Sequence, residues 1–204
     1  MRFKNAELEM HERSDTILSV PTYEPTYELT EISRRKIVII GDPKTGKTSI
    51  VRRFTEGSIP TEYTPTYFEN SKKRVALKKE KIELNIFDAG GDKKFDNIRP
   101  LNYTGADLFI ITFALDSKDS LQNVVKKWAP EISKLDGVPI ILVGNKEDKR
   151  FDSTGKEFVS YKEGINARDT IKAVEYIECS AKKNIRIEEI FEFALQDDSE
   201  ESLW

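Results

Sequence analysis

A short glycine-bearing segment, GDPKTGKTS at Gly41–Ser49, constrains the fold more than any other part of this chain. An apolar run, RKIVIIG at 35–41, precedes it, and a segment of helical character, TSIVRRF at 48–54, follows it. The pattern GxxxxGK[ST] between a strand and a helix is typical of a loop that binds phosphate. A glycine turn that carries a lysine by chance is the competing interpretation, and the flanking strand and helix disfavour it.

The chemistry of such a loop is anion binding. Unpaired backbone N–H groups and the dipole at a helix N-terminus attract negative charge. Gly41 and Gly46 allow the backbone to approach phosphate closely, because they carry no Cβ atom. Lys47 is expected to reach the outer phosphates, and Thr48 to offer its hydroxyl to Mg²⁺.

Composition limits the class of protein. The chain has 204 residues, a formal net charge of −3 and a single cysteine, Cys179. This charge argues against a nucleic-acid binder, and one cysteine excludes an internal disulfide. The sequence contains no apolar run of roughly eighteen residues and no signal peptide at its start. We therefore expect a monomeric cytoplasmic protein, recruited to membranes through partners if at all.

The sequence divides into three parts. Residues 1–34 are polar, contain the tandem repeat PTYEPTYE and are predicted to form a mobile N-terminal extension. This extension either has no role or competes with the similar segment PTYFE, 65–69, for a partner or for the protein's own surface. Residues 35–196 are predicted to form one domain, and residues 197–204 an acidic tail.

Strand and helix patterns alternate through the predicted domain. Apolar or alternating runs predict strands at 35–41, 108–115, 140–145 and 176–179, and a two-stranded hairpin at 73–88. Helices are predicted at 48–54, 117–135, 162–174 and 185–196, with Ser117 as an N-cap and Pro130 as a bend or an early end. Residues 56–71 and the segment DAGGDKKFDN are predicted to be irregular loops. This alternation predicts an α/β fold with a mostly parallel six-stranded sheet and about five helices.

Three further motifs follow predicted strands, where ligands of parallel sheets bind. In DAGG, Asp88 is placed to hold Mg²⁺ and Gly91 to offer its N–H to a terminal phosphate. In NKED, Asp148 can accept the N1 and N2 hydrogens of guanine, a donor pair that adenine lacks. In ECSAK, the N–H of Ala181 can meet guanine O6, whereas Cys179 is expected to be a packed residue. Each motif alone could be a polar turn, but all of them occur in one order at strand ends.

These motifs give the chain a close resemblance to the small GTPases over Arg35–Gln196, and to their Rho branch in particular. The segments IPTEYTPTYFEN, IRPLNY, KKWAPEI, IILVGNKED and VEYIECSA carry the Rho resemblance. It implies the P-loop NTPase fold in its small-GTPase form and a switch between GTP and GDP with Mg²⁺. Residues 57–70 and 88–101 would be the two switch loops, which bind effector proteins, and exchange factors are further implied partners.

The resemblance also implies residue roles. Tyr63 would lie over the phosphates, and Thr66 would join Mg²⁺ through its hydroxyl and meet the γ-phosphate through its N–H. The implied metal ligands are Thr48, Thr66 and Asp88, and the implied catalytic residues are Lys47, Thr66, Gly91 and Asp92. The implied nucleotide-binding residues are Gly41, Asp42, Pro43, Lys44, Thr45, Gly46, Lys47, Thr48, Ser49, Tyr63, Thr66, Gly91, Asn145, Lys146, Asp148, Ser180, Ala181 and Lys182.

The chain departs from the family pattern at several positions. Asp92 stands where a water-orienting glutamine is usual, and Pro43 replaces a glycine near the entry of an activator's arginine. Asp92 predicts slow intrinsic hydrolysis, because an ionised carboxylate cannot donate a hydrogen bond and carries negative charge toward the γ-phosphate. Together with Pro43 it predicts that ordinary activation is weak or absent. Ile59 replaces an aromatic residue beside the nucleoside, which predicts fast nucleotide release.

Two further segments depart as well. The segment 149–160 looks shorter than the inserted helix of Rho proteins, and the final residues ESLW lack the cysteine of a prenylation motif, so that no lipid anchor is visible in this chain.

The alternative function is a hydrolysis-deficient binding module that stays loaded with GTP. A P-loop phosphotransferase is disfavoured, because NKED and ECSAK would have no use in it.

Overall fold

The computed structural model describes residues 32–77, 80–135, 137–152 and 157–195. Its six strands form one sheet in the order β2-β3-β1-β4-β5-β6, in which β2 pairs antiparallel with β3 and the other pairs are parallel. The strands are β1 (Ile32–Ile40), β2 (Phe68–Leu77), β3 (Glu80–Ala89), β4 (Leu108–Ala114), β5 (Ile140–Asn145) and β6 (Glu175–Glu178). The mostly parallel six-stranded sheet predicted from the sequence is therefore confirmed.

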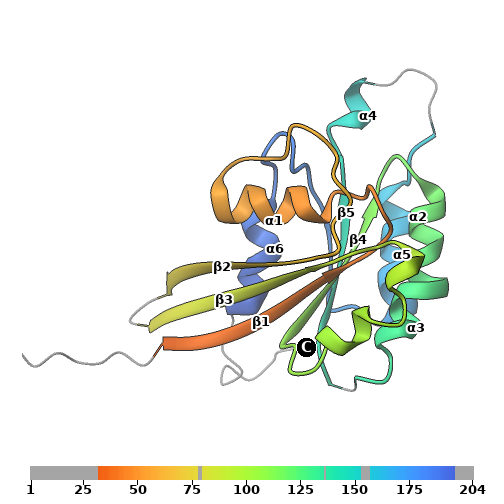
Figure 1. The fold of residues 1–204 in the computed structure, drawn as a ribbon. Helices are drawn as coiled ribbons and strands as arrows, with labels where there is room; N and C mark the ends of the chain where they lie inside the picture. Colours follow the sequence, from red (N-terminus) through yellow and green to blue (C-terminus); the bar gives the residue numbers. More distant parts are fainter. Residues whose placement is uncertain (1–31, 78–79, 136, 153–156, 196–204) are drawn as a thin grey trace, which may run out of the picture.

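Helices cover both faces of this sheet (Figure 1). On one face lie α1 (Lys47–Glu56) and α6 (Ile187–Glu192), which the short 3₁₀ turn η4 (Phe193–Leu195) extends. On the other face lie α5 (Tyr161–Ile171) and a continuous helical run made of α2 (Lys118–Asn123), the π-helical turn η3 (Val124–Trp128) and α3 (Ala129–Ile132). The described residues also contain the single-turn α4 (Lys149–Asp152) and two 3₁₀ turns, η1 (Lys93–Phe95) and η2 (Arg99–Asn102).

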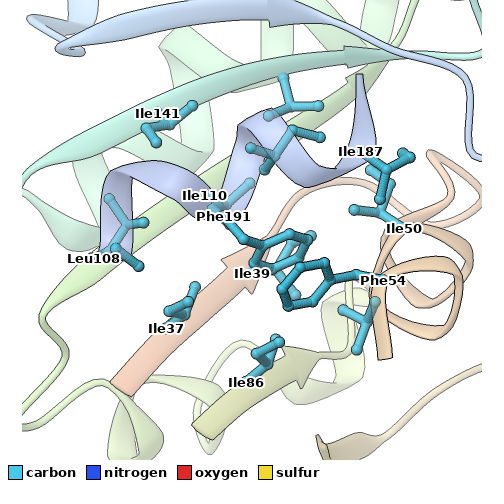
Figure 2. Close-up of a cluster of buried hydrophobic side chains, with 14 of the residues drawn as sticks. Ile37, Ile39, Ile50, Phe54, Ile86, Leu108, Ile110, Ile141, Ile187 and Phe191 are labelled. Carbon is cyan, nitrogen blue, oxygen red and sulfur yellow. The ribbon is translucent and has the colours of Figure 1, made fainter. Parts of the chain in front are cut away.

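Successive side chains of β1 point to opposite faces of the sheet, so this strand contributes to the hydrophobic cores on both faces. Ile37 and Ile39 point to one face and pack with α1 and α6, where the rings of Phe54 and Phe191 stack with centroids 3.9 Å apart (Figure 2). Val38 and Ile40 belong to the second cluster, on the face of η3 and α5. The apolar run of β1 is therefore continuous because the strand is buried on both sides, as in parallel sheets generally.

Several predicted boundaries need correction. Strand β1 begins at Ile32, which pairs with Lys81, so residues 32–34 belong to the domain and not to the N-terminal extension. Strand β2 begins at Phe68, which pairs with Ala89, so the loop predicted to end at 71 is shorter. In both places the pairing of a distant strand outweighs polar local sequence. Residues 1–31, with the PTYE repeat, and the tail from 197 lie outside the described residues.

The helical run 118–132 agrees with its predicted start and continues past its proline. The hydroxyl of Ser117 accepts the N–H of Ser120 at 3.3 Å, as an N-cap does. The run neither ends nor breaks at Pro130, because η3 is a π-helical turn in which the Ala129 N–H bonds the Val124 carbonyl. The change of hydrogen-bond register just before the proline accommodates its missing N–H.

Candidate functional site

Loops gather at one edge of the sheet, because parallel strands place their carboxyl ends together. The segment 41–46, called the phosphate-binding loop below, joins β1 to α1, and residues 90–92 follow β3. Residues 146–148 follow β5, and residues 179–182 follow β6. The four motifs identified in the sequence thus lie at the same edge.

The phosphate-binding loop needs its two glycines. Gly41 has φ 142° and Gly46 has φ 96°. A Cβ atom on Gly41 would lie 2.1 Å from the Thr112 carbonyl oxygen, and one on Gly46 would lie 2.2 Å from Nδ2 of Asn145. The loop therefore packs directly on β4 and on the NKED segment, which fixes its curl.

Lys47 is buried beneath this loop. Its Nζ donates to the carbonyl oxygens of Gly41 and Asp42, both at 3.0 Å. Burial lowers the pKa of Lys47 to about 8, although the nearby Asp88 and Asp42 act in the opposite direction. A desolvated ammonium hydrogen-bonded to two carbonyl oxygens is well suited to an incoming phosphate, whose charge would favour its protonated form.

The three predicted metal ligands lie together. The Thr48 hydroxyl donates to Oδ2 of Asp88 at 2.5 Å and lies 2.8 Å from the hydroxyl of Thr66. Burial raises the pKa of Asp88 to about 6, and its Oδ1 is buried with no hydrogen-bond partner among the described residues. A buried carboxylate oxygen without a partner beside two hydroxyls fits a hard divalent cation such as Mg²⁺.

A cavity of about 750 Å³ opens above these groups. Its lining includes Pro43, Lys44, Ser49, Tyr63 and Thr66, together with Lys47, Thr48 and the segment 90–92. Gly91 is in close contact with the phosphate-binding loop, since a Cβ atom there would lie 2.3 Å from the Gly41 carbonyl oxygen. Much of the predicted phosphate site and two of the three predicted metal ligands, Thr48 and Thr66, therefore line one space, whereas Asp88 is not part of this lining.

The Asp92 side chain contacts the turn that directly follows it, η1. Its Oδ1 accepts the N–H of Lys94 at 3.1 Å, which caps η1, and its Oδ2 lies 3.7 Å from the Lys94 ammonium. The side chain is about half exposed. The carboxylate is thus already engaged by one residue two positions along the chain.

The predicted base-recognition residues form a second group. Asn145 donates through Nδ2 to the Thr45 carbonyl oxygen at 2.9 Å and accepts the Ala181 N–H at Oδ1, at 3.2 Å. The Ser180 hydroxyl donates to Oδ1 of Asp148 at 2.5 Å, and among the described residues Oδ2 of Asp148 has no hydrogen-bond partner. That oxygen is available to a ligand. The NKED and ECSAK segments are therefore tied to each other and to the phosphate-binding loop.

The remaining predicted residues have different surroundings, and of them only Lys146 is in the lining of the cavity formed by the described residues. Lys146 has φ 71°, lines the cavity and lies 3.4 Å from Oδ1 of Asp116. The Thr45 hydroxyl donates to the Asp42 carbonyl oxygen at 3.0 Å. Lys182 is exposed, and its carbonyl oxygen accepts a hydrogen bond from Arg53 at 3.5 Å. Ile59 is half-buried and packs against the core cluster of α1 and α6.

The sequence interpretation missed three supporting groups. Asp116 follows β4 and pairs with Lys146 and Lys149, so its position at a strand end was the available signal. Arg99 is 3% exposed and donates to the carbonyl oxygen of Gly90 at 2.9 Å, which fixes the DAGG segment. Arg52 pairs with Glu69 at 3.0 Å and joins α1 to β2. Arg52 lies in the predicted helix 48–54 and Arg99 in the segment IRPLNY, but neither is among the site residues predicted from the sequence.

The fold and the site together define a small GTPase. Comparison with known proteins identifies the family and relatives of this chain. The model of the Ras family matches residues 36–199. The chain is 42% identical over 162 residues to GTP-binding protein rho3 of Schizosaccharomyces pombe, which covers 77% of this chain and 79% of that protein. It is 41% identical over 170 residues to GTP-binding protein RHO1 of Candida albicans, covering 79% and 86% respectively.

The chain therefore belongs to the Ras family and, within it, to the Rho group of small GTPases. Its ligands are GTP and GDP with Mg²⁺, and its family activity is GTP hydrolysis as part of a GTP-dependent switch. Within the described residues, no helix is both long and apolar enough to cross a membrane.

Proposed function

We propose that this protein is a Rho-like signalling switch whose intrinsic GTP hydrolysis is slow, and that the geometry of Asp92 is the cause. A group that orients the attacking water must reach it with a free acceptor and, ideally, a donor. Asp92 has no donor when ionised, and its Oδ1 already accepts the N–H of Lys94. Its negative charge also opposes the charge that develops on the phosphates.

The other parts of the site support in-line attack by water. Lys47 would stabilise charge on the outer phosphates, and the N–H of Gly91 would bind the γ-phosphate. Mg²⁺, bound by Thr48, Thr66 and Asp88, would neutralise charge on the phosphate oxygens. These roles are supported by the burial of Lys47 and by the unpartnered Oδ1 of Asp88.

We also propose that effectors and exchange factors bind residues 57–70 and 88–101, with regulation of the cytoskeleton as the outcome. Large apolar side chains in these segments are unusually exposed: Tyr67 is 68% exposed, Ile98 56% and Leu101 77%. Clusters of exposed apolar side chains mark protein-binding surfaces. The names of the fungal relatives support the GTP-binding part of this proposal only.

Single-turnover hydrolysis of preloaded GTP tests the central claim. The Asp92→Gln variant should hydrolyse at least about tenfold faster than the wild type, because positioned proton-transfer groups contribute roughly 10²- to 10⁴-fold. Asp92→Asn is the matched control, since it removes the charge but keeps the short side chain. An Asp92→Gln rate within about twofold of the wild type would refute the role given to Asp92.

The same hydrolysis assay distinguishes the proposed switch from the alternative function, a binding module that stays loaded with GTP. Pro43 is exposed at the cavity rim, where a rigid ring limits the approach of an activator's cation. If the wild type retains its GTP over many hours and Asp92→Gln also fails to hydrolyse it, the protein is a binding module that remains loaded with GTP.

A further inference from the structure

Lys44 has an unusual backbone conformation within the phosphate-binding loop. Its φ is 64°, in the left-handed region, whereas the other positive φ values of this loop belong to Gly41 and Gly46. Residues with a Cβ atom rarely adopt this conformation outside positions with a specific role. The Lys44 side chain is exposed, and the residue lines the cavity of about 750 Å³.

The ammonium of Lys44 meets an aromatic ring from a different loop. Its Nζ lies 5.5 Å from the centroid of the Tyr63 ring, within the range of a cation–π interaction. Tyr63 itself is 57% exposed and lines the same cavity. Among the described residues, Lys44 has no carboxylate partner, so the ring is its one specific contact there. The contact therefore joins the phosphate-binding loop to residues 57–70 across the mouth of the cavity.

We infer that Lys44 is a positioning residue that holds Tyr63 over the bound phosphates. This inference rests on the proposed nucleotide site. The cation attracts the face of the ring on one side and the phosphate oxygens on the other, so that both interactions favour the closed arrangement of the loop. GTP carries more negative charge than GDP, so the same ammonium holds the loop closed more strongly over the triphosphate. Lys44 thereby slows nucleotide release and increases the preference for GTP.

Release of a fluorescent guanine nucleotide, followed in a stopped-flow instrument with excess unlabelled nucleotide, tests this inference. Lys44→Ala should speed release of the triphosphate about two- to fivefold, the effect of one exposed cation–π contact, and release of the diphosphate less. Lys44→Arg should restore the wild-type rate, since arginine makes the same contact. Lys162→Ala removes an exposed lysine of α5 and should leave both rates unchanged.

A double-mutant cycle with Tyr63 decides whether the ring is the partner. In the Tyr63→Leu background, Lys44→Ala should have a smaller effect, because only the attraction between the ammonium and the phosphates is left to lose, whereas in the Tyr63→Phe background, which retains a ring, its full effect should remain. An equal effect of Lys44→Ala in the Tyr63→Leu background and in the wild type would overturn the inference, as would no effect in the wild type. Failure of the wild type to bind guanine nucleotide would instead overturn the proposed site.

Discussion

Replacement of Trp128 by phenylalanine should reveal a buried link between the phosphate-binding loop and the helix η3. Trp128 is fully buried, and its Nε1 donates to Oδ1 of Asp42 at 2.8 Å. Asn123 donates to Oδ2 of the same carboxylate at 2.7 Å. An acidic side chain in a loop that binds phosphate is thus turned away from the anion and satisfied by the helical run.

The magnitude follows from these contacts. A hydrogen bond to a charged group contributes about 1.5–3 kcal/mol, and the smaller ring leaves a void that costs roughly 1 kcal/mol more. Phenylalanine retains a ring face for Arg99, whose guanidinium lies 4.6 Å from the indole, so that contact is largely kept. Trp128→Phe should therefore lower the free energy of unfolding by about 2.5–4 kcal/mol and the melting temperature by roughly 5–16 °C.

Guanidinium and thermal unfolding of the nucleotide-free protein measure this change, and Asp42→Asn closes a double-mutant cycle. An asparagine at position 42 still accepts the indole N–H but without charge, so the coupling energy between the two substitutions should be at least about 1 kcal/mol. Additivity within about 0.5 kcal/mol would refute the link, because it would mean that the indole and the carboxylate do not interact.

Two further outcomes follow from individual side chains. Burial raises the pKa of Asp88 to about 6 from an ordinary value of 3.8, so the folded nucleotide-free protein binds more protons than the unfolded chain between about pH 4 and 6. The stabilisation from this group is present below pH 4 and is lost as the pH rises through 6. Mg²⁺ needs the ionised carboxylate, so Mg²⁺ affinity measured by calorimetry with GTP present should fall as the pH is lowered through 6, and Asp88→Asn should leave only the weaker pH dependence that the terminal phosphate of the nucleotide contributes itself. Ile59→Phe should slow nucleotide release, because a ring restores stacking area beside the nucleoside; an unchanged, already slow release rate would contradict it.

The sequence predicts the parts of this site that depend on short-range spacing. A strand that ends in glycine and is followed by Lys47 and Thr48 fixes a loop and a helix start within nine residues, Gly41–Ser49, and the structure has both there. Asp88 was placed beside Thr48 because parallel strands end at one edge, and the 2.5 Å contact between them agrees. The parallel topology therefore converts positions forty residues apart into neighbours in a predictable way.

The contacts that the sequence does not predict connect loops to helices. Arg99 reaches Glu131 on α3, thirty-two residues away, and Trp128 reaches Asp42 across eighty-six. Such pairs depend on how a helix rotates and where its register changes, and here a π-helical turn at Val124–Trp128 sets the direction of the indole. No spacing rule within one element encodes that rotation.

Three aspartates of the site illustrate the difference. The sequence singles out Asp42, Asp88 and Asp92 equally well, since each lies at or just after the carboxyl end of a strand at the same edge, yet their surroundings give them separate chemistry. Asp42 accepts hydrogen bonds from Trp128 and Asn123 with its two carboxylate oxygens, and Asp88 keeps one buried oxygen for a cation. The Asp92 carboxylate caps the η1 turn, because it accepts the N–H of Lys94. A glutamine at position 92 could not cap η1 through a carboxylate, so the η1 turn should be less stable in the Asp92→Gln variant. We therefore expect this variant to have a lower free energy of unfolding than the wild type, although it hydrolyses GTP faster.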